Sequence, residues 1–72
     1  KISPNPADSW AKIEWPGKSG TWRAFNALGQ LIGSNRIDGG VSYIDVKAWP
    51  SGVYFVEVLS GKVREVGKLI RK

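Results

Sequence analysis

The chain has 72 residues, with eleven basic and six acidic side chains and a formal net charge of +5. It contains no Cys and no His, which excludes disulfide frameworks, zinc fingers and the Ser–His and Cys–His forms of nucleophilic catalysis. A domain of this length buries only about 60–65% of its unfolded surface, so a deep catalytic cleft is not expected. Because Met is also absent, we expect residues 1–72 to be a single domain excised from a longer protein.

Charge is concentrated at the C-terminal end. Residues 60–72 contain five basic residues and one acidic residue, whereas residues 1–59 contain six basic and five acidic residues. A basic end of this kind can meet nucleic acid, anionic lipid or an acidic protein groove. Alternatively, its lysines protect the edge of a sheet. The chain contains no run of 18 apolar residues, so a membrane-spanning helix is not expected.

Short apolar segments separated by nine Gly and four Pro are typical of many short strands joined by turns. No segment has the periodicity of an amphipathic helix. Residues 2–6 include two prolines and are expected to be an edge strand or a lead-in. After residues 21–27, Leu28-Gly29 predicts a tight turn in which Gly29 has a positive φ. The remaining strands are expected at residues 8–15, 21–27, 30–34, 41–46, 52–59 and 63–72, with a short extended piece at 36–37.

Residues 52–59 have the strongest strand signal, because nearly all of them are β-branched or aromatic. Alternation places Tyr54, Val56 and Val58 on one face, and the other face is apolar except for Glu57. A strand that is apolar on both faces is expected in the interior of its sheet. About seven short strands in so small a chain favour an all-β, immunoglobulin-like antiparallel β-sandwich, with a five-stranded barrel as the second choice.

The six carboxylates are scattered over turns and strand faces. They form neither a glycosidase-like pair nor an Asp-rich calcium loop, and no glycine-rich phosphate motif occurs. The sequence therefore predicts that the domain is not an enzyme, with no catalytic residue, no cofactor and no metal site.

The four Trp residues are the most suggestive feature of the composition. Trp10, Trp15, Trp22 and Trp49 either form a platform for sugar rings or bases, or fill the core of the sandwich. Trp49 precedes Pro50 in a connection, so it is the one expected to be partly exposed. Nucleic-acid binding is not expected, since aromatic and basic residues do not alternate over a sufficient length.

Several motifs follow one another in a defined order. Ser3-Pro4-Asn5-Pro6-Ala7 comes first, and then Phe25-Asn26-Ala27-Leu28-Gly29-Gln30-Leu31, Val46–Pro50, Ser51-Gly52-Val53-Tyr54-Phe55-Val56, Gly61-Lys62-Val63 and Lys68-Leu69-Ile70-Arg71-Lys72. In this order, and over nearly the whole chain, the motifs resemble the C-terminal sorting domain of type IX secretion cargo proteins (type A), a family of Bacteroidetes-type bacteria.

The resemblance implies a domain of about seven strands at the C-terminus of a larger exported protein. Such domains are read in the periplasm by the outer-membrane type IX translocon. A sortase-like cysteine peptidase then usually cleaves them, and the cargo is anchored at the cell surface or released. The implied partners are the translocon, the sortase-like components and the upstream cargo domain, and the cleavage junction is expected at or before Lys1.

The physical reading of particular residues agrees with this role. A side chain at Gly52 is expected to clash with a turn, Tyr54 offers a large anchor with a polar tip, and the basic terminal strand can pair with a partner strand. Trp22 and Trp49 are bulkier than the family pattern suggests. The family motif positions are Pro4, Asn5, Pro6, Leu28 and Gly29, and the residues expected to contribute to translocon recognition are Gly52, Tyr54, Lys68, Arg71 and Lys72. Two other functions stay open: a carbohydrate-binding accessory module and a purely structural immunoglobulin-like spacer.

Overall fold

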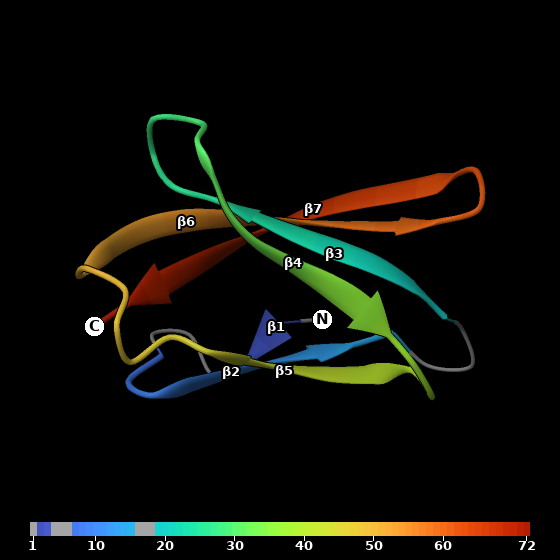
Figure 1. Cartoon of the computed structure of the whole chain (residues 1–72), viewed down its shortest axis with the longest axis horizontal. Coiled ribbons are helices and arrows are strands. Elements are labelled where there is room, and N and C mark those ends of the chain that lie inside the picture. Colours follow the sequence, from blue (N-terminus) through green and yellow to red (C-terminus); the bar gives the residue numbers. More distant parts are fainter. Residues whose placement is uncertain (1, 4–6, 16–18) are drawn as a thin grey trace.

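The computed structural model describes residues 2, 3, 7–15 and 19–72, which form two antiparallel sheets packed face to face (Figure 1). One sheet has the strand order β1-β2-β5 and the other has the order β4-β3-β6-β7. The strands are β1 (Ile2–Ser3), β2 (Trp10–Glu14), β3 (Gly20–Phe25), β4 (Leu31–Ile37), β5 (Val41–Asp45), β6 (Gly52–Ser60) and β7 (Val63–Arg71).

The predicted all-β sandwich of seven short strands is confirmed, and the two separate sheets replace the barrel alternative. The place of β4 distinguishes the fold from an antibody constant domain, where the first, second, fourth and fifth strands share a sheet. Here β4 pairs with β3. The expected division into a strand at residues 30–34 and a short piece at 36–37 is wrong, because β4 pairs with β3 without interruption from Gly33 to Ile37. The irregularity lies where Phe25 pairs with Leu31.

The core lies between the sheets and follows the alternation of the strands. As predicted, β6 is an interior strand, flanked by β3 and β7. Its residues Tyr54, Val56 and Val58 point into the core and are at most 5% exposed. The buried apolar side chains that surround them are Ala7, Ala11, Ile13, Trp15, Trp22, Ala24, Ile37, Ile44, Val46 and Leu69.

The four Trp residues do not form a common platform. Trp15 and Trp22 are buried in the core, and the indole Nε1 of Trp22 donates to Ser42 Oγ of the opposite sheet at 3.1 Å. Trp49 is half-buried, as predicted. Trp10 is 51% exposed, and the ammonium group of Lys47 lies 5.9 Å from the centre of its ring. The sugar-platform hypothesis therefore loses its basis, since the indoles occupy separate environments.

Candidate recognition site at one end of the sandwich

Three segments that are far apart in sequence meet at one end of the sandwich, on the left in Figure 1. They are the β3–β4 turn (residues 26–30), the β5–β6 connection (residues 46–51) and the end of β7. The turn and the connection together line a hollow of about 410 Å³, with Leu28, Ile32, Trp49, Gly52 and Tyr54 among its walls. Motif residues from three separate blocks thus border the same surface depression.

The C-terminus joins this end through the backbone of Ala7. The Ala7 N–H donates to the carbonyl of Ile70 at 2.7 Å, and the Ala7 carbonyl accepts from the N–H of Lys72 at 2.9 Å. Ser51 Oγ donates to the carbonyl of Lys72 at 2.8 Å. The last residues of the chain are therefore already paired on the side away from β6, which limits β-augmentation at this position to the part of β7 that precedes them.

Tyr54 forms the corner between the β5–β6 connection and β6. Its hydroxyl donates to the carbonyl of Pro50, and its ring centre lies 4.8 Å from that of Trp49. The same arrangement, called a tyrosine corner, occurs near the start of the sixth strand in immunoglobulin domains. Because Tyr54 is only 5% exposed, its polar tip serves the fold of this corner.

Gly52 begins β6 with a φ of +148°. The expected clash of a side chain with a turn is wrong, because a Cβ atom at this position would meet no heavy atom within 4 Å. Glycine is needed here for its backbone conformation, which other residues adopt only with strain.

The β3–β4 turn is organised by Asn26. Its side-chain Oδ1 accepts from the N–H groups of Leu28 and Gln30, both at 3.0 Å. Gly29 has a φ of +82°, which confirms the predicted tight turn. The turn projects Leu28 into solvent with 84% of its surface exposed, so that a large apolar side chain stands at the rim of the hollow.

Arg71 ties the end of β7 to the β5–β6 connection. Its Nε donates to the carbonyl of Val46 at 2.7 Å, its Nη2 to that of Lys47 at 3.2 Å, and its Nη1 to that of Lys72 at 2.7 Å. The guanidinium group therefore donates charge-assisted hydrogen bonds to backbone carbonyls within the domain.

A scan against protein-family models matches the secretion system C-terminal sorting domain over residues 1–72. The chain belongs to this family. No curated protein matches it. The type IX sorting signal predicted from the motifs is thereby confirmed as the family of the chain, and membership places the domain in an exported protein.

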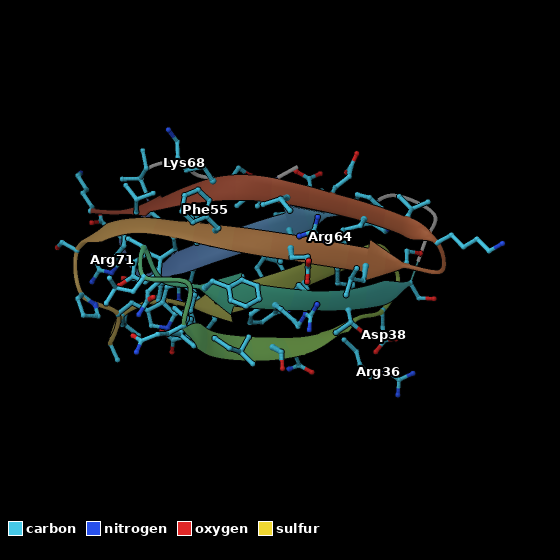
Figure 2. The ribbon with its side chains drawn as sticks, turned by 90° about the horizontal axis from the view of Figure 1, so that it is seen from above. Arg36, Asp38, Phe55, Arg64, Lys68 and Arg71 are labelled. Carbon is cyan, nitrogen blue, oxygen red and sulfur yellow. The ribbon has the colours of Figure 1, made fainter. Side chains whose placement is uncertain are left out.

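The sorting domain brings most of the residues singled out in the sequence to this one end. Leu28, Gly29, Gly52, Tyr54, Arg71 and Lys72 all lie there, whereas Lys68 is exposed on the outer face of the four-stranded sheet, opposite Phe55 (Figure 2). The Lys72 ammonium group is 3.9 Å from Asp8 Oδ2, and both side chains are largely exposed. The motif positions Pro4, Asn5 and Pro6 fall outside the described residues.

An ion cluster that was not predicted from the sequence lies on the outer face of the same sheet. Glu57 Oε1 accepts from Arg23 Nε at 2.8 Å and from Arg23 Nη2 at 2.5 Å, and Glu57 Oε2 accepts from Arg64 Nε. The hydrogen bonds from Arg64 and Arg23 hold the pKa of Glu57 below its ordinary value. Only the register that sets Arg23 opposite Glu57 could have revealed the cluster.

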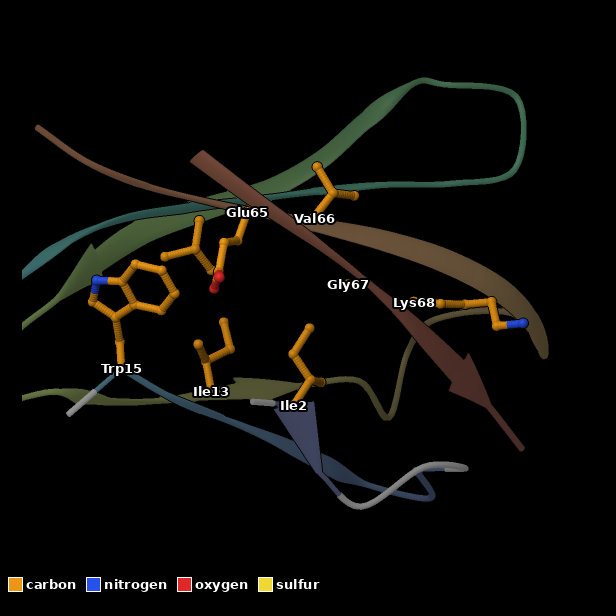
Figure 3. A pocket seen from close by; sticks show the side chains of 8 residues that line it. Ile2, Ile13, Trp15, Glu65, Val66, Gly67 and Lys68 are labelled. Atoms are coloured by element: carbon orange, nitrogen blue, oxygen red, sulfur yellow. The ribbon is translucent and has the colours of Figure 1, made fainter. Parts of the chain in front are cut away.

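A second hollow opens on the side of the sandwich between β1, β2 and β7 (Figure 3). Ile2, Ile13, Trp15 and Val58 form its apolar wall, and the side chain of Glu65 points into it (Figure 3). Within the described ranges, no group of three or more potential ligands gathers for a metal ion, and no helix could cross a membrane.

Proposed function

We propose that the domain is the sorting signal of an exported cargo protein. In this proposal, the type IX translocon recognises the end of the sandwich that carries the motif residues, together with the terminal strand β7. The observation that carries this proposal is the convergence of the separate motif blocks on one end of the fold. Convergence of this kind lets a receptor test the whole folded domain through one small surface.

The residues of this end divide into two roles. Gly52, Tyr54 and Arg71 shape the end through backbone conformation, the corner hydrogen bond and the carbonyl contacts. Leu28 and Lys72 are exposed and can contact a partner directly. An exposed apolar side chain and an exposed basic one at the same end of the sandwich suit a translocon surface that combines an apolar pocket with acidic residues.

The proposal also covers the steps that follow recognition of the domain. After recognition, a sortase-like cysteine peptidase cleaves the chain at or before Lys1, and the cargo is anchored at the cell surface or released. Mass spectrometry of the cargo tests this step. A cargo that still carries residues 1–72 at the cell surface would contradict it.

Fusion of the chain to the C-terminus of a periplasmic reporter tests the main proposal. In a strain with a working type IX system, we expect the reporter at the cell surface or in the medium. The same fusion with Leu28→Ser should remain in the periplasm, while Tyr43→Ser, which changes a 62% exposed residue on the opposite sheet, should be exported. Periplasmic retention of the stably folded unmodified fusion would contradict the sorting role.

The contribution of terminal charge needs variants that leave the Arg71 contacts intact. Lys68→Gln and Lys72→Gln together remove two exposed positive charges and retain Leu69 and Ile70. We expect a folded domain with reduced export, because exposed charge changes usually alter stability by less than about 0.5 kcal/mol. Normal export of this double variant would show that strand shape, and not charge, is recognised.

A further inference from the structure

The outer face of the four-stranded sheet carries an open apolar surface. Val53 and Phe55 of β6 and Val66 and Ile70 of β7 point away from the core, and their exposed fractions lie between 36% and 52%. The β6–β7 register sets Val53 opposite Ile70 and Glu57 opposite Val66. Figure 2 looks onto this face and shows Phe55, Arg64 and Lys68 on it. We call these four apolar residues, with Phe25, Arg23, Glu57, Arg64 and Lys68, the outer surface.

A hollow lies where the outer surface meets the β3–β4 turn. It has a volume of about 310 Å³, and Phe25, Phe55, Val66, Glu57 and Arg64 are among the residues that line it. This volume is at the small end of the range for ligand pockets and suits a single large apolar side chain. Its lining combines the aromatic rings of Phe25 and Phe55 with the guanidinium group of Arg64.

The charge of the outer surface is unbalanced. Two arginines share the single carboxylate of Glu57, whose side chain is only 6% exposed, while those of Arg23 and Arg64 are 44% and 63% exposed. In the hydrogen bonds formed among described residues, Arg64 uses only its Nε. Its Nη1 and Nη2 groups therefore form a fork, oriented by Glu57, that faces solvent and matches an incoming carboxylate.

We infer that the outer surface is a docking site for a protein of the export machinery that presents an acidic side chain beside a large apolar one. The apolar side chain enters the hollow, and the carboxylate binds the fork of Arg64. This inference rests on the proposed sorting function, since it assigns a second contact surface to the same recognition event.

Two other occupants fit the surface less well. A second copy in a two-fold dimer would bring the same basic patch against itself, which like-charge repulsion disfavours. An anionic lipid layer would attract the arginines, but membrane-surface proteins insert protruding apolar side chains. Here the apolar residues are half-covered, and Phe25, Phe55 and Val66 line a recess.

A matched pair of substitutions at Val66 tests the inference. Val66→Glu places a carboxylate opposite Glu57 on the same face, where it can bind Arg64 from within the domain, and Val66→Gln has nearly the same shape without the charge. We expect export of the reporter fusion to fall by roughly tenfold or more for Val66→Glu, and by much less for Val66→Gln. Val41→Glu and Val41→Gln are the controls, because Val41 is 38% exposed on the other sheet, and both should be exported normally.

Crosslinking identifies the occupant. Because the chain contains no Cys, Val53→Cys or Val41→Cys introduces a single attachment point for a photoactivated crosslinker in exporting cells. We expect an adduct between the Val53→Cys protein and one export-machinery protein, identified by mass spectrometry, that Val66→Glu abolishes and that Val41→Cys does not form. Thermal unfolding followed by Trp fluorescence verifies that each variant is folded.

The outcomes separate this inference from the sorting function. If the unmodified fusion is exported and folded Val66→Glu is exported equally well, the docking surface is overturned while the sorting role stands. An adduct with lipopolysaccharide, or with a second copy of the chain, also overturns the inference that a protein of the export machinery occupies the surface. If the unmodified fusion is not exported, the sorting function itself fails.

Discussion

Replacing Tyr54 with Phe removes one oxygen atom from the corner between the β5–β6 connection and β6. The variant retains the ring, which is buried and lies 4.8 Å from the ring of Trp49, and loses only the hydrogen bond to the Pro50 carbonyl. Since Pro50 is exposed, water can replace the hydroxyl as donor. We therefore expect a loss of about 0.5–1.5 kcal/mol, the net value of one hydrogen bond, or a decrease in Tm of roughly 4–8 °C per kcal/mol.

Tyr54→Ala is a much larger perturbation. Truncating a buried aromatic side chain costs about 3–5 kcal/mol, and loss of the contact with Trp49 adds about 0.5–1.5 kcal/mol. A domain of this length has a total free energy of unfolding on the order of 4–11 kcal/mol. Tyr54→Ala is therefore expected to be largely unfolded or proteolysed and not exported.

Urea unfolding followed by Trp fluorescence measures both losses, because the buried Trp15 and Trp22 change environment on unfolding. If Tyr54→Phe is destabilised as much as Tyr54→Ala, the hydroxyl contributes more than one hydrogen bond to the Pro50 carbonyl, and the small loss expected for Tyr54→Phe is refuted. Stability of Tyr54→Ala within about 1 kcal/mol of the unmodified protein would refute the packing argument. A folded Tyr54→Phe fusion that stays in the periplasm would assign the hydroxyl to recognition.

Three further predictions concern the same end of the domain and the ion cluster. Gly52→Ala should lower the free energy of unfolding by about 1–3 kcal/mol because of its positive φ; an unchanged urea midpoint would contradict this. Arg71→Lys keeps the charge but loses the planar guanidinium group, so it should destabilise the domain by about 1–3 kcal/mol. Lys72→Gln, in contrast, should change stability by less than about 0.5 kcal/mol. Equal effects of the two variants would refute the role of the Arg71 contacts with backbone carbonyls. Because the folded-state pKa of Glu57 is lowered, its contribution is complete above the ordinary glutamate pKa and is lost as pH falls through the lowered value. The free energy of unfolding should therefore decrease below about pH 4, and Glu57→Gln should reduce that slope; an identical acid limb in the variant would show that the cluster is not responsible.

Local sequence determined the strands and one of the turns. Alternation placed Tyr54, Val56 and Val58 on one face of β6 and left Glu57 as the polar residue of the other, because successive side chains of a strand point to opposite faces. Gly29 was predictable because its turn requires a positive φ. The motif order was equally informative about family, since it depends on residue identity and spacing alone. Residues 30–37 were harder to divide, because the continuity of β4 comes from its pairing with β3 and not from its own polar composition.

The site depended on contacts that sequence does not specify. Arg23 and Glu57 are 34 positions apart, and Arg71 and the Val46 carbonyl are 25 apart. Whether such groups meet is decided by strand register, and a shift of one residue would turn each side chain to the other face of the sheet. The tertiary structure therefore decided that Arg71 binds carbonyls within the domain, that the four Trp side chains occupy separate environments, and that two arginines converge on Glu57, because each of these arrangements forms only when distant strands pack together.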